Sequence, residues 1–201
     1  MLVGPLDEGG AAMANEFRSR TARDLFLARP AIAMDMKTPP TDQLSIEFCR
    51  ALLAGRVPEE AITFCAYLLP ERAAVWWAHE CLGNLAELLD GRDLELLALI
   101  RDWVGEPGDP RHRTAMETAA EATPPATPAA WICLAAASHD NVSANDGAPA
   151  HFPAGHAVSA GILAGLARVS LADRYAVLAA FVDMGMQIAE MEAQRQAADA
   201  Y

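Results

Sequence analysis

Five residues in one stretch of the chain carry imidazole or carboxylate groups, which bind metal ions and transfer protons. They are His139, Asp140, Asp146, His151 and His156. The stretch, "SHDNVSANDGAPAHFPAG", is rich in Asn, Asp, Gly and Pro and predicts a long loop over about residues 138–155. Histidine and carboxylates are ligands for zinc and also general acids and bases. Loop residues lack the fixed spacing of a helical ligand pair, so the stretch indicates a candidate site without a defined reaction.

A second group is "HEC" at positions 79–81, where His79 and Glu80 resemble the start of a zinc-protease helix. That motif needs another histidine four residues after the first, and position 83 is Gly83, so the sequence does not fit it. The cysteines are widely spaced, form no CxxC pair and lie in apolar helical patterns, which is typical of reduced, buried thiols. They are Cys49, Cys65, Cys81 and Cys133.

The third feature is a pair of adjacent tryptophans in "LPERAAVWWAHECLGNL". Consecutive side chains on a helix are about 100° apart and cannot share a face. Trp77 lies with the apolar row and is predicted to be in the core. Trp76 lies on the polar side with Arg72, His79 and Glu80. Two interpretations stay open: a neighbouring helix covers Trp76, or Trp76 is an exposed anchor for a partner.

The elements that position these residues are predicted to be helices. Alanine supplies 43 of 201 residues, whereas Val and Ile together supply 16, and this balance favours helix over strand. Pro and Gly divide the chain into eight or nine helices joined mostly by short turns. We therefore expect an all-α fold of antiparallel hairpins, either a compact array or a short HEAT-like or TPR-like stack. The ranges are about 15–28, 41–54, 58–69, 70–91, 93–105, 110–122, 128–137, 154–168 and 171 onward.

This pattern also predicts how the chain is organised. Residues 1–40 form a flexible or partly helical N-terminal segment, and residues 41–201 form one helical domain. The N-terminus lacks the basic and apolar runs of a signal peptide, and no stretch has the roughly 18 uninterrupted apolar residues of a spanning helix. We expect a cytoplasmic protein without membrane insertion.

The net charge of the chain limits the kinds of molecule that it is expected to bind. The chain has 27 acidic and 15 basic side chains and a net charge of -12, so nucleic acid is not expected to bind. Residues 87–109 hold seven carboxylates and two arginines. This run is typical of a solvated face, and it also suits a basic partner.

Three segments together resemble a family of uncharacterised bacterial proteins. They are "LLPERAAVWWAHECL", "TPAAWICLAAAS" and "PAGHAVSAGILAGLA", and the similarity covers roughly residues 41–170, with the AVWWA helix as its specific element. Some such proteins look to be encoded near type VI secretion genes. The resemblance implies an accessory role in that setting and no catalytic residue.

The leading hypothesis is a non-enzymatic protein-interaction or accessory module that requires no cofactor. Its partner is expected to be another protein, either basic or a component of a secretion system, bound through Trp76, Arg72, His79 and Glu80. The alternative is a small metal-binding protein or hydrolase. Its site would lie between the loop at 138–156 and the helix that carries His79 and Glu80.

Overall fold

The structure, a computed structural model, describes residues 21–106, 109–122, 127–138 and 152–199. In this part of the chain every regular element is a helix, which confirms the all-α prediction. The ten α-helices are α2 (Ala22–Ala28), α3 (Ile32–Asp35), α4 (Ser45–Leu53), α5 (Glu59–Leu68), α6 (Glu71–Gly83), α7 (Gly91–Gly105), α8 (Pro110–Ala122), α9 (Pro128–Ser138), α10 (Ala154–Leu166) and α11 (Arg174–Asp199), and a 3-10 helix η1 covers Ala86–Leu88. The additional helix relative to the nine predicted is α3.

Polar residues fix several of the helix starts. Thr21 begins α2 with a capping box, in which its side chain accepts from the Asp24 backbone and Asp24 accepts from the Thr21 backbone. Asp90 caps α7 by accepting from the backbone nitrogen of Asp93 at 2.9 Å. Each cap satisfies backbone N–H groups that have no partner within the helix.

Several predicted helix boundaries were wrong. Helix α2 begins at Ala22, directly after its cap Thr21, and α11 begins at Arg174. Helix α4 begins at Ser45, because the Thr41 side chain accepts from the Gln43 backbone nitrogen instead of capping a helix. The helix after Pro70 ends at Gly83, well before Gly91. Both Gly83 and Asn84 have low helix propensity, and the Asn84 amide donates to the Glu80 carbonyl at 2.8 Å.

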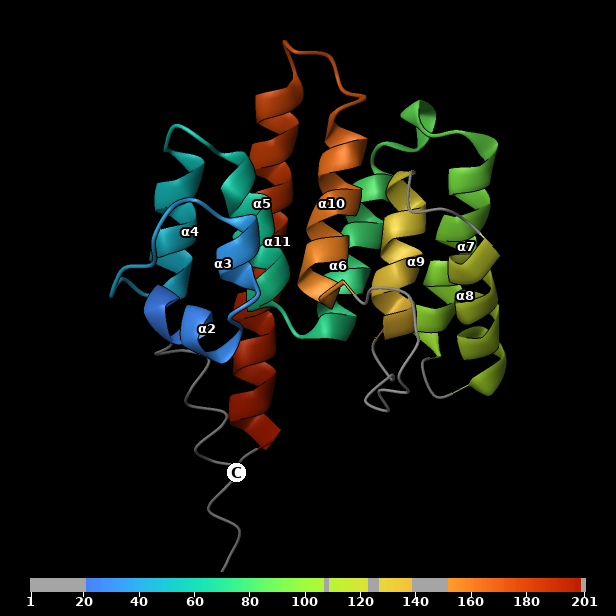
Figure 1. The fold of residues 1–201 in the computed structure, drawn as a ribbon, viewed down its shortest axis with the longest axis horizontal. Coiled ribbons are helices and arrows are strands. Elements are labelled where there is room, and N and C mark those ends of the chain that lie inside the picture. The colour runs from blue at the N-terminus through green and yellow to red at the C-terminus, as the bar shows by residue number, and fades with distance from the viewer. Residues whose placement is uncertain (1–20, 107–108, 123–126, 139–151, 200–201) are drawn as a thin grey trace, which may run out of the picture.

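Helix α5 lies between α4 and α10 (Figure 1), and α3 and α11 also pack against it. All residues from 60 to 69 are buried, so this helix has no solvent-facing side. Its one buried carboxylate, Glu60, accepts from the backbone nitrogens of Lys37 at 2.8 Å and Thr38 at 3.1 Å. Helix α5 therefore also fixes the segment that follows α3. Leu25 and Ile32 of the predicted N-terminal segment are fully buried in the same cluster as Trp77.

Helix α10 approaches its neighbours through glycines. A Cβ atom at Gly161 would lie 2.8 Å from the Pro128 carbonyl oxygen and would overlap the Ile132 side chain. A Cβ atom at Gly155 would lie 2.8 Å from the Tyr67 ring. Gly161 therefore allows close packing of α10 against α9, and Gly155 allows close packing of α10 against α5.

Candidate functional site

Helix α6 carries all four residues that were predicted to bind a partner. The backbone nitrogen of Ala74 donates to the Pro70 carbonyl at 2.8 Å, so the first turn forms directly after the proline. The alanines that follow have the highest helix propensity. Trp76 lies four residues after Arg72, three before His79 and four before Glu80, so each of these residues is its neighbour on the helix surface.

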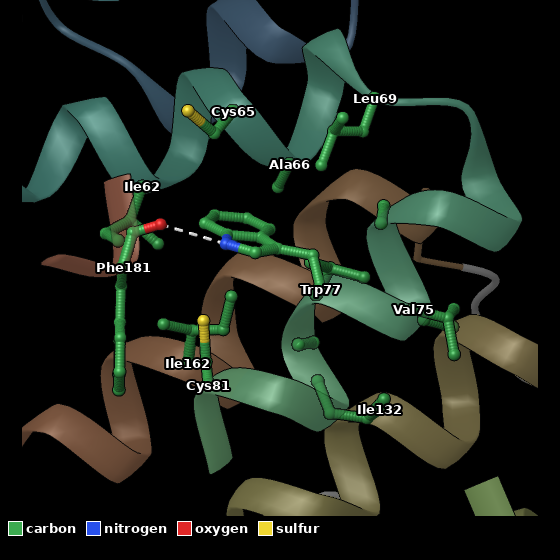
Figure 2. Packing of buried hydrophobic residues seen from close by; sticks show 14 of the residues in the cluster. Ile62, Cys65, Ala66, Leu69, Val75, Trp77, Cys81, Ile132, Ile162 and Phe181 are labelled. Atoms are coloured by element: carbon green, nitrogen blue, oxygen red, sulfur yellow. Dashed lines mark hydrogen bonds between the residues drawn. The ribbon is translucent and has the colours of Figure 1, made fainter. Parts of the chain in front are cut away.

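The two tryptophans have opposite environments, as the periodicity predicts. Trp77 is fully buried, and its indole nitrogen donates to the Phe181 carbonyl of α11 at 2.9 Å (Figure 2). The Trp76 side chain is on the other side of α6, and 38% of the residue is exposed. Most of the Trp76 residue is therefore covered by the fold, and the exposed part remains accessible to a partner.

Polar groups lie one helical turn before and after Trp76. The Arg72 guanidinium donates to the Val104 carbonyl at the end of α7 at 2.7 Å. On the other side, Nδ1 of His79 lies 3.1 Å from a Glu80 carboxylate oxygen. The Glu80 side chain is 44% exposed, whereas that of His79 is 19% exposed. Trp76 thus lies between a cation that is bound to α7 and an accessible carboxylate.

Of the five loop residues with metal-binding or acid-base groups, the structure describes one. His139, Asp140, Asp146 and His151 lie outside the described residues. His156 lies in the first turn of α10, and its Nδ1 is 2.8 Å from Oδ1 of Asp35 in α3.

Asp35 joins three helices through its two carboxylate oxygens. Oδ1 accepts from His156, and Oδ2 accepts from the Tyr67 hydroxyl of α5 at 2.6 Å. Burial and the bond to Asp35 raise the pKa of the Tyr67 phenol well above its usual range, so the phenol stays a donor. A carboxylate only accepts, so Nδ1 of His156 carries the proton of this hydrogen bond. This is the arrangement of a histidine general base.

Aromatic rings enclose the imidazole of His156. The Phe152 ring stacks on it with centroids 5.0 Å apart and an interplanar angle of 14°. The Trp131 ring from α9 meets it edge-on at 5.8 Å. The His156 side chain is still 31% exposed, so the imidazole is held in one orientation and remains accessible. Asp35 was not predicted, because it is 121 residues away from His156 and belongs to no motif.

One further group within the described residues has metal-ligand chemistry. The ligand atoms of Glu106, Asp109 and His112 lie within 4.8 Å of one another at the start of α8. Arg111 already pairs with Asp109 at 2.6 Å, and its hydrogen bonds lower the pKa of Asp109 to about 2. Asp109 is therefore already paired with Arg111, and such groups of acidic residues near a protein surface are common without an ion.

The described part of the protein is all-helical, and its helix α6 carries the partly exposed Trp76 between Arg72 and Glu80. The chain belongs to a family of unknown function, DUF6931, whose model matches residues 48–189. This confirms the predicted relationship to an uncharacterised family. Neither a curated protein nor a solved structure matches the chain. Among the described helices, none has both the length and the apolar character needed to cross a membrane.

Proposed function

We propose that this protein is a non-enzymatic interaction module that binds another protein through α6. The observation that carries the proposal is the exposure of Trp76 on the same helix on which Trp77 is fully buried. Tryptophan dominates many interfaces because one rigid ring buries a large area at low entropic cost. Removing this ring from water would favour binding.

The polar neighbours and the charge suggest the chemistry of the partner. Arg72 is held by Val104, so its guanidinium loses little freedom when a partner docks. The accessible Glu80 carboxylate and the net charge of -12 favour a protein surface with basic side chains. The resemblance to proteins encoded near type VI secretion genes makes a component of that apparatus the first partner to test.

We expect Trp76→Ala to abolish partner capture from native lysate while the protein stays folded. Binding of the identified partner should weaken about tenfold or more, because interface tryptophans are frequent hot spots. The matched control is Leu94→Ala, which removes a side chain of comparable exposure, 44%, from α7. A Trp76→Ala protein that is folded and captures the same partner with unchanged affinity would contradict the proposal.

A second function is favoured by one observation, the 2.8 Å contact between Asp35 and His156. The predicted alternative of a small hydrolase would then use His156 as general base, oriented by Asp35. This differs from the predicted arrangement, in which the helix with His79 and Glu80 supplied the other half of the site.

The hydrolase alternative predicts measurable turnover of chromogenic ester, amide or phosphoester substrates. Replacing His156 by Gln should reduce the rate at least about a hundredfold, the usual contribution of a general base. Arg111→Gln, at a distant exposed arginine, serves as the control. Equal rates for wild type and His156→Gln would eliminate this function.

A further inference from the structure

Two of the four cysteines lie in contact inside the core. The sulfur of Cys49 in α4 is 3.2 Å from the sulfur of Cys65 in α5, and both residues are fully buried. Cys49 also donates weakly to the Ala61 carbonyl at 3.8 Å. All four cysteines are free thiols. The packing of Phe48 against Phe64, with ring centroids 5.0 Å apart, fixes the same two turns of α4 and α5.

We propose that Cys49 and Cys65 are a redox-active pair that closes a disulfide when the protein meets hydrogen peroxide. This inference is independent of the proposed binding function. The sulfurs are already in contact at 3.2 Å, and a disulfide shortens this distance to about 2.05 Å. The product would join α4 covalently to helix α5.

The chemistry balances with peroxide as the only oxidant. One cysteine loses its thiol proton, and its sulfur attacks a peroxide oxygen as the thiolate. The O–O bond breaks, and the departing hydroxide takes up that proton, so a sulfenic acid and one water result. The sulfur of the other cysteine then attacks the sulfenic sulfur, the S–O bond breaks, and a second water leaves. In total, two thiols lose two protons and two electrons, and one peroxide takes these up and becomes two waters.

Burial makes this a slow and selective reaction. The hydrogen bond with Cys49 and burial raise the pKa of the Cys65 thiol well above its usual range, and thiolate is the reactive form. Peroxide is nearly as small as water, so it reaches a site that larger disulfide oxidants do not. Cys81 and Cys133 are also buried. They serve as internal controls, because they test whether entry of peroxide into the core is by itself enough to oxidise a thiol.

The test uses the native protein treated with hydrogen peroxide, quenched with catalase, alkylated in denaturant and digested with trypsin without reduction. The four cysteines fall in separate tryptic peptides, 38–50, 57–72, 73–92 and 114–168. We expect peptides 38–50 and 57–72 to be linked, with the loss of two hydrogens, and Cys81 and Cys133 to be alkylated. Dithiothreitol should reverse the link.

Oxidation should also raise the melting temperature, because the bond closes a loop between residues 16 positions apart and restricts the unfolded chain. Cys81→Ser should keep both effects, and Cys65→Ser should lose them. The proposal is overturned if native protein yields four alkylated cysteines under conditions that link the unfolded chain. It is equally overturned if Cys49 and Cys65 are recovered as separate sulfinic acids.

Discussion

Trp77→Ala is expected to lower the free energy of unfolding by about 3–5 kcal/mol, the usual cost of removing a large aromatic residue from a core. Trp77 is fully buried and lies among Ile62, Leu69 and Ile162 (Figure 2). The substitution leaves a cavity at the junction of α5, α6, α10 and α11. Because domains of this kind are stable by only about 5–15 kcal/mol, a large part of the population could unfold. Urea denaturation followed by circular dichroism measures the change.

Two variants separate the causes of this loss. Trp77→Phe keeps an aromatic ring but removes the indole donor to the Phe181 carbonyl, and we expect a smaller loss of about 1–2 kcal/mol. Trp76→Ala removes a ring that is 38% exposed and should cost about 1 kcal/mol or less. If Trp76→Ala destabilises the protein as much as Trp77→Ala, Trp76 is a structural residue. The proposal that it binds a partner would then be contradicted.

The contrast between the tryptophans was predictable because it depends only on helical periodicity. The side of α6 that carries Trp77 is apolar over several turns, and the pattern alone places it in the core. The end of α6 was predicted less well. The choice between ending at Gly83 and continuing to Gly91 depends on a local competition, in which the Asn84 side chain binds the Glu80 carbonyl.

Contacts between distant positions were not predictable from the sequence. Asp35 and His156 are brought together only because α3 and α10 both pack on α5. Asp93 illustrates the same limit. In the sequence it belongs to an acidic run that is typical of a solvated face, but the structure buries it completely. Helical periodicity places position 93 on the face of Leu96, Leu97 and Ile100, but nothing local shows that partners distant in the sequence compensate a charge there.

Asp93 is the buried charge that connects α7, α9 and the end of α10. Its Oδ1 accepts from the backbone nitrogen of Ala129 in the first turn of α9 at 3.0 Å. Its Oδ2 lies 3.0 Å from the guanidinium of Arg168, which also donates to the Leu88 carbonyl. A carboxylate without solvent needs such partners, because burying an unpaired charge is costly.

Arg168→Met is therefore expected to lower the free energy of unfolding by about 3 kcal/mol, since removing one partner leaves an uncompensated buried charge. Methionine retains an apolar stem of similar length, so lost packing contributes little. The control is Arg92→Met on α7. Its guanidinium pairs with Glu95 at the surface, and such pairs contribute about 1 kcal/mol or less. Urea denaturation of the purified variants gives both values.

A second substitution tests whether charge causes the loss. Asp93→Asn in the Arg168→Met background removes the buried charge and keeps an oxygen that can accept from Ala129. We expect the double variant to be more stable than Arg168→Met alone, although Asp93→Asn alone should be less stable than wild type. Asp93→Asn would thus lower the free energy of unfolding of the wild type and raise that of the Arg168→Met variant. Such a change of sign shows that the two residues are energetically coupled. Additive losses would instead show that Arg168 stabilises α10 through the Leu88 carbonyl and not through Asp93.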